Sequence, residues 1–211
     1  MPRIDDYKAA RALAQAALTK RNPKHVADKS RSEFFSDEGQ GGVIVPYFGQ
    51  PRRVAWPEIT VTPAEGGGEP PLTEQILILH YLERATGEPV SGVNIDFRAV
   101  PEGSFYWSAF VSRAKKPLLE MFGRDPDFYL VVATFMGGIP VPLGDVAVQF
   151  QAFPLVPVTH VLWRGDEEFD PDASILFDET ISGHLSTEDI AALAGASVYR
   201  LMAAARQVRK Q

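Results

Sequence analysis

The stretch that decides the fold is residues 145–163, DVAVQFQAFPLVPVTHVLW. From Val146 to Phe150 every second side chain is a large apolar one, a period typical of a strand that buries one face. Residues 153–157, FPLVP, interrupt this pattern, and it resumes over residues 158–163. The short interruption favours a return of the chain beside itself, so the sequence predicts two antiparallel neighbouring strands.

Further strands are predicted before and after this stretch. Residues 93–97 alternate apolar and polar side chains, and residues 174–178, SILFD, read as a last strand. Residues 42–62 predict a hairpin with its turn at Gly49. Proline cannot donate a hydrogen bond to a neighbouring strand, so Pro46 and Pro57 place this hairpin at the edge of a sheet.

Helices are predicted at both ends of the chain and in its middle. Residues 4–20 form an amphipathic N-terminal helix, and residues 71–87, PLTEQILILHYLERATG, have so little polar surface that this helix is expected to be central and buried. A capping box begins the closing helix over residues 187–209. Residues 64–71, AEGGGEPP, are expected to form a flexible loop.

These elements alternate without the regular strand–helix–strand order of a parallel sheet. The sequence therefore predicts an α+β fold, with residues 1–211 as a single domain. Its mainly antiparallel sheet is accompanied by the N-terminal helix, the central buried helix and a C-terminal helix packed on it.

Composition excludes several classes of function. The 21 basic and 27 acidic residues give a formal charge of -6, which argues against nucleic acid as a partner. Cysteine is absent, so this chain ligates no iron–sulfur cluster and no thiolate zinc. The first residues lack the apolar core of a signal peptide, and no apolar run suits a membrane span, so a cytoplasmic protein is expected.

An acidic segment, RGDEEFDPD (164–172), raises the question of a metal or catalytic site. Pro171 stands where a calcium-binding loop needs glycine, and Phe177 where it needs a bidentate glutamate, so that motif fails. We favour turns between strands for this segment. The alternative is a metal- or carboxylate-dependent enzyme, whose site would use His184, Glu188, Asp166 and Glu168.

A second candidate site lies in residues 97–116, where aromatic and basic side chains are interleaved. Aromatic faces beside cations suit a planar, acidic ligand, which they hold by stacking and charge pairing. The plainer alternative is a core helix with a basic outer face. The residues assigned to this site are Arg98, Tyr106, Trp107, Arg113, Lys115, Lys116 and, from the central helix, His80.

Several segments together resemble one family, the prokaryotic domain-of-unknown-function family 3786. They are PLTEQILILHYL, FRAVPEGSFYWSAF, KPLLEMFG, residues 150–178 and LSTEDIAALA. The resemblance implies a single domain found mainly in anaerobic bacteria and archaea. It also implies a setting of corrinoid and one-carbon metabolism. Some members are joined to cysteine-rich iron–sulfur segments, so here any cluster would belong to a partner.

Three functions follow as expectations. The first is a cytoplasmic accessory protein that binds a planar acidic cofactor, with a corrinoid or other tetrapyrrole as the leading ligand, or an iron–sulfur or corrinoid partner protein. The second is the metal- or carboxylate-dependent enzyme. The third is a protein-interaction module that uses the edge hairpin or an exposed apolar surface. The oligomeric state stays open.

Overall fold

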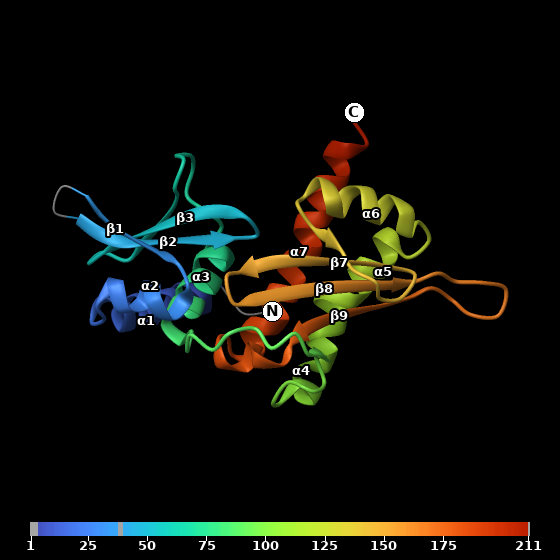
Figure 1. Ribbon diagram of the computed structural model, residues 1–211, viewed down its shortest axis with the longest axis horizontal. Coiled ribbons are helices and arrows are strands. Elements are labelled where there is room, and N and C mark those ends of the chain that lie inside the picture. Colours follow the sequence, from blue (N-terminus) through green and yellow to red (C-terminus); the bar gives the residue numbers. More distant parts are fainter. Residues whose placement is uncertain (1–3, 38–39, 211) are drawn as a thin grey trace. The chain divides into compact units, whose positions relative to one another are not determined.

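The computed structural model describes residues 4–37 and 40–210, and the chain divides into two compact units (Figure 1). Unit 1 is Met1–Pro89 together with Phe153–Leu155 and Gly183–Leu185. Unit 2 is Val90–Ala152, Val156–Ser182 and Ser186–Gln211. After Pro89 the chain therefore returns to unit 1 twice, each time for one short segment.

Among its described residues, unit 1 combines helices with one antiparallel sheet. Its helices are α1 (Ile4–Thr19), α2 (Pro23–Ser30) and α3 (Leu72–Arg84). Its strands, in the order β1-β2-β3-β4, are β1 (Glu33–Asp37), β2 (Gln40–Tyr47), β3 (Gln50–Trp56) and β4 (Thr60–Pro63). The turn between β2 and β3 has φ of 75° at Gly49, a conformation that glycine adopts without steric cost.

Helix α3 forms the centre of unit 1, with Ile78, Leu79 and Tyr81 fully buried. The Tyr81 ring stacks on Phe153 with 4.3 Å between ring centroids. Its hydroxyl donates to the carbonyl oxygen of Ser30 at 2.7 Å and accepts a hydrogen bond from the Leu155 N–H at 3.3 Å. Burial raises the pKa of Tyr81, so the hydroxyl stays protonated and keeps its role as donor.

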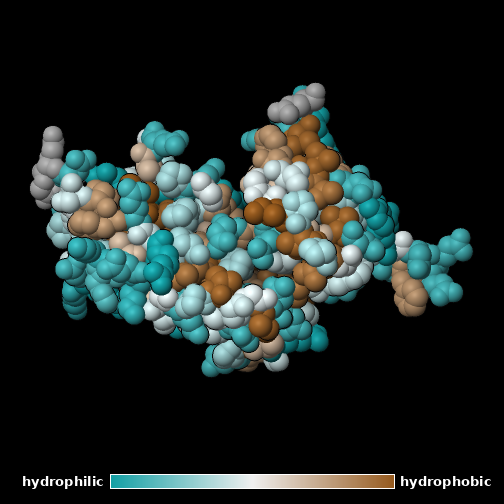
Figure 2. Space-filling view, viewed as in Figure 1, coloured by the Kyte–Doolittle hydropathy of each residue, from teal (hydrophilic) through white to brown (hydrophobic). Residues whose placement is uncertain are grey.

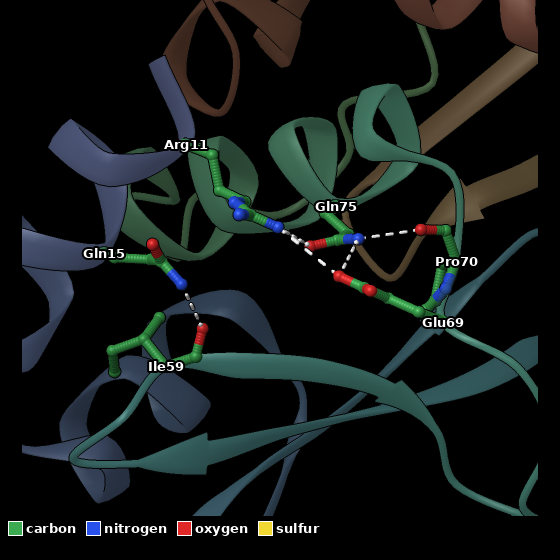
Figure 3. A network of polar contacts seen from close by, with 6 residues as sticks. All are labelled: Arg11, Gln15, Ile59, Glu69, Pro70 and Gln75. Carbon is green, nitrogen blue, oxygen red and sulfur yellow. Dashed lines mark hydrogen bonds and ion pairs between the residues drawn. The ribbon is translucent and has the colours of Figure 1, made fainter. Parts of the chain in front are cut away.

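A polar network ties α1 to the start of α3 (Figure 3). The Arg11 guanidinium donates to Gln75 Oε1 at 3.1 Å and approaches Glu69 Oε1 at 3.4 Å. Gln75 Nε2 in turn donates to Glu69 Oε1 at 3.0 Å and to the Pro70 carbonyl oxygen at 2.7 Å. The predicted loop 64–71 has no helix or strand, but these bonds hold its last residues in place.

Unit 2 contains a second antiparallel sheet. Within the described residues its strand order is β5-β9-β8-β7-β6, with β5 (Asn94–Asp96), β6 (Ile139–Pro140), β7 (Val146–Phe153), β8 (Val156–Trp163) and β9 (Asp172–Asp178). The helical elements are α4 (Gly103–Phe110), the π-helical turn η1 (Val111–Lys115), α5 (Lys116–Phe122), α6 (Pro126–Phe135), the 3-10 turn η2 (Glu179–Gly183) and α7 (Thr187–Val208).

Helices cover one face of this sheet. His160 of β8 is hydrogen-bonded to Ser197 of α7 at 2.8 Å, and Phe177 of β9 lies edge-on to Phe110 of α4, with 6.4 Å between ring centroids. Apart from His160, the side chains of β8 and β9 on this face are apolar, as expected for a sheet packed against helices. Along residues 4–37 and 40–210, no helix has both the length and the apolar character needed to cross a bilayer.

The end of β9 is fixed by a buried carboxylate. Asp178 is 2% exposed and accepts hydrogen bonds from the N–H groups of Ser91 (3.1 Å), Gly92 (2.7 Å) and Thr180 (3.1 Å). Burial alone raises the pKa of this carboxyl, but the hydrogen bonds from Thr180, Ser91 and Gly92 outweigh it, so the pKa lies below its usual range. The ionised carboxylate thereby fastens the segment before β5 to the sheet.

The predicted α+β class is confirmed, and the N-terminal, central and C-terminal helices occur at the predicted residues, but the described strands form two antiparallel sheets where one was predicted. The edge position of the hairpin 42–62 is wrong, because β2 and β3 are both interior strands. Pro46 pairs with Pro51 at the turn end of the hairpin, where few ladder hydrogen bonds remain to be lost. Helix α2 and strand β1 were not predicted, and the single domain over 1–211 stays a prediction.

We expect Tyr81→Phe to lower the free energy of unfolding by roughly 1–3 kcal/mol, because it removes the acceptor of the buried Leu155 N–H and the hydroxyl that donates to the Ser30 carbonyl. Urea denaturation followed by tryptophan fluorescence measures this loss. Tyr199→Phe, at a ring that is 55% exposed, is the matched control and should change stability by less than about 0.5 kcal/mol. Equal stability of the two variants would contradict the role given to the Tyr81 hydroxyl.

Candidate functional site

The first candidate site begins at the turn after β5. The Asp96 carboxylate accepts the N–H groups of Arg98 at 2.8 Å and Ala99 at 3.0 Å, a local turn that aspartate favours. This turn presents the Arg98 side chain to α4. Its guanidinium carbon lies 4.0 Å from the centroid of the Trp107 ring, within the range of a cation–π interaction.

Gly103 allows α4 to begin directly against that turn. A methyl group at this position would lie 1.9 Å from the carbonyl oxygen of Phe97, so any larger residue would push the helix away. The close approach lets the rings of Phe97 and Phe110 stack at 4.4 Å, and Trp107 stacks on Phe110 at 5.4 Å. The stacked rings of Phe97 and Phe110 therefore support Trp107, on which Arg98 lies.

The outer rings of α4 remain accessible to a ligand. Phe105 is 82% exposed, and its ring stands edge-on to Tyr106 with 5.2 Å between centroids. Tyr106 and Trp107 are half-buried. Phe110, in contrast, belongs to the core. The aromatic residues thus fall into two groups. The buried rings of Phe97 and Phe110 support α4, and the rings of Phe105, Tyr106 and Trp107 lie toward solvent.

The basic residues predicted for this site are distributed along η1 and α5. Lys115 is bound to Asp172 at 2.9 Å, and Lys116 lies 3.7 Å from Glu120 on the next turn. Arg113 is half-buried and its backbone packs beside Gly195 of α7, where an added methyl would meet the Arg113 carbonyl at 3.3 Å. Of the predicted cations, Arg98 alone is brought onto an aromatic ring in the described residues.

His80 does not share a unit with the other members of the predicted cofactor set. It is half-buried on α3 in unit 1, whereas Arg98 and the residues of α4, η1 and α5 belong to unit 2. The local cluster that the structure brings together is therefore Arg98 with Trp107, next to the exposed ring of Phe105 and its neighbour Tyr106.

The predicted metal residues are not gathered. Among residues 4–37 and 40–210, no group of His, Cys, Asp or Glu side chains has the arrangement needed to hold a metal ion. His184 is fully buried in unit 1, whereas Glu188, Asp166 and Glu168 are exposed in unit 2.

Asp166 serves a structural role in the segment 164–171. Its Oδ1 accepts the N–H groups of Glu168 and Phe169, each at 2.8 Å, and these hydrogen bonds hold the pKa of the carboxyl below its usual range. The interpretation of this segment as a turn between strands is confirmed. The hairpin that carries it projects beyond the sheet in Figure 1.

A pocket beside this turn was not predicted. It has a volume of about 340 Å³ and lies between the junction of α5 with α6 and the segment 164–171. Arg164 is held there by Asp127 at 2.6 Å, and this hydrogen bond keeps the pKa of Asp127 below its usual range. The sequence offered one signal for it, the Asp125-Pro126 helix start after Arg124, but the approach of residues 164–171 is a property of the fold.

A polar cluster lies inside unit 2, where Tyr129 of α6, His160 of β8 and Ser197 of α7 meet. Ser197 Oγ donates to the Ala194 carbonyl oxygen at 2.7 Å, so its contact with His160 Nε2 uses the imidazole N–H as donor. In that tautomer His160 does not act as a base toward Ser197. With both residues buried, the pair is structural.

Acid should destabilise the fold through His160, because burial lowers the pKa of this imidazole to about 3 from 6.5. The unfolded chain takes up a proton below pH 6.5 and the folded chain does not, so stability falls as the pH drops from 6.5 toward 3. The slope contributed by one such group is about 1.4 kcal/mol per pH unit.

His160→Gln removes this titration while keeping a polar partner for Ser197. Urea denaturation between about pH 6.5 and pH 4 should show a shallower pH dependence in this variant than in the unaltered chain. His25→Gln, at an exposed position, is the matched control for the loss of an imidazole. Identical slopes for all three proteins would refute a buried neutral His160.

A family profile described as domain of unknown function (DUF3786) matches residues 22–200. The chain therefore belongs to this family, as its resemblance predicted. No curated protein and no solved structure matches the chain.

Proposed function

We propose that this chain is an accessory binding protein whose site is the surface formed by Arg98 and the outer rings of α4. Its ligand is a planar acidic cofactor, with a corrinoid or other tetrapyrrole as the leading candidate, bound free or on a partner protein. The observation that carries the proposal is the Arg98 guanidinium held 4.0 Å above the Trp107 ring, next to a phenylalanine that is 82% exposed.

The geometry supports stacking combined with charge pairing. A phenylalanine side chain exposed to this extent loses hydrophobic stabilisation in water, and a flat ligand placed on it would recover that free energy. Arg98 offers the planar donor fork that pairs with carboxylates in a bidentate manner. Because Trp107 and Asp96 already restrict Arg98 and its turn, little conformational entropy is lost on binding.

The remaining predicted cations support the site less directly. Lys115 is engaged with Asp172, so its charge is largely compensated. Lys116, whose side chain is 67% exposed, lies 3.7 Å from Glu120, and such exposed pairs are weak enough to exchange partners at little cost. The proposal therefore rests on Arg98 and the aromatic rings, and it assigns no part to a metal site built from His184 or the acidic segment.

Titration with haemin and with hydroxocobalamin, followed by absorbance, tests the proposal. Arg98→Gln should weaken binding of the acidic porphyrin by about tenfold, since one charge-assisted hydrogen-bond pair is lost. Phe105→Ala should weaken both ligands by removing the stacking surface. Tyr199→Ala, which removes an exposed ring on α7, is the matched control. Binding unaffected by Arg98→Gln and Phe105→Ala, or absent for both ligands, would overturn the proposal.

A second candidate function, protein interaction, is favoured by exposed apolar side chains on and after α6. Val131 is 54%, Phe135 53% and Ile139 67% exposed. Val131 and Phe135 are one helical turn apart, and apolar surface also gathers in the upper part of unit 2 in the view of Figure 2. Sedimentation of the unaltered chain and of Phe135→Ser tests this candidate, because a self-interaction through α6 would be weakened by the serine.

A further inference from the structure

A pocket of about 340 Å³ lies in unit 2 at the junction between α5 and α6, apart from the α4 surface. Its volume is at the small end of the range of known ligand pockets, so it suits a metabolite rather than a large cofactor. The charged side chains in its wall come from two segments of chain. The wall includes Arg124, Arg164, Asp166, Asp170 and Phe169.

One cation and one anion of the wall are already oriented. Arg164 donates to Asp127 at 2.6 Å through its guanidinium, and its backbone N–H donates to Asp145 at 2.7 Å. Asp166 is fixed by the two backbone N–H groups that it accepts at 2.8 Å. These contacts preorganise the wall, which reduces the entropic cost of binding.

The other two charges in the wall are uncommitted. In the described part of the chain, no side-chain hydrogen bond or ion pair engages Arg124 or Asp170. Both side chains are exposed, and they lie on opposite segments of the wall, Arg124 before α6 and Asp170 before β9. Phe169 directly precedes Asp170 in the sequence. Its side chain is 69% exposed and offers an apolar surface next to the charged residues of the wall.

The balance of these charges identifies the class of ligand. A simple anion would pair with Arg124 but meet the carboxylate of Asp170, and a simple cation would pair with Asp170 but meet the Arg124 guanidinium. We infer that this pocket binds a small zwitterion with an ammonium and a carboxylate group, such as an α-amino acid with an aromatic side chain. Its carboxylate pairs with Arg124, its ammonium with Asp170, and its ring packs on Phe169.

Three probes of nearly equal shape separate the charge requirements. L-phenylalanine carries both groups, phenylpropanoate lacks the ammonium, and phenethylamine lacks the carboxylate. We expect amide NMR shifts of Gly165 and Phe169 in the isotopically labelled full chain to report binding of L-phenylalanine. Its affinity should exceed that of either single-charge probe by about tenfold, the value of one charge-assisted hydrogen bond.

Matched variants test which charged side chain of the pocket binds which group of the ligand. Arg124→Gln should weaken L-phenylalanine and phenylpropanoate by about tenfold and leave phenethylamine unchanged, and Asp170→Asn should do the reverse. Lys210→Gln, an exposed lysine remote in sequence, is the control. Binding of phenylpropanoate as tight as that of L-phenylalanine would overturn the zwitterion, and so would shifts absent for every probe at about 10 mM. This test does not use the Arg98→Gln variant or a tetrapyrrole ligand. The pocket proposal and the proposed function of the α4 surface can therefore fail independently of each other.

Discussion

The stacking of Tyr81 on Phe153 is the interaction on which the architecture depends. Tyr81 is at the centre of unit 1, and Phe153 is the last residue of β7, whose other residues belong to unit 2. Leu155, which begins the return to β8, donates its N–H to the Tyr81 hydroxyl. The core of unit 1 is therefore completed by residues 153–155, which connect β7 to β8, and the segment Gly183–Leu185 likewise belongs to unit 1.

Local sequence patterns predicted some elements of this fold and missed others. The alternation from Val146 to Phe150 and the capping box at Ser186 are local signals, and both appear in the structure. Helix α2 has few residues and a polar sequence, so its apolar period is weak, although Asn22 caps it in the expected way. The interior positions of β2 and β3 depend on their pairing with β1 and β4, and β1 was not predicted as a strand.

The candidate sites follow the same division between local and long-range information. The contact between Arg98 and Trp107 could be anticipated from the sequence, because only a short loop and the start of helix α4 separate the two residues. The pairing of Lys115 with Asp172 was not, since it depends on how η1 packs along β9. The pocket at Arg124 likewise needs two distant segments, and the sequence of either one shows ordinary turn residues.

Native-state hydrogen exchange of the unaltered chain and of Phe153→Ala tests the central role of this turn most directly. Amides of α3 report on unit 1 and amides of β8 report on unit 2. The account predicts that the variant lowers the protection of both sets by the same free energy, roughly 3–5 kcal/mol for loss of a buried phenylalanine. Loss of protection confined to α3, with β8 unchanged, would contradict it.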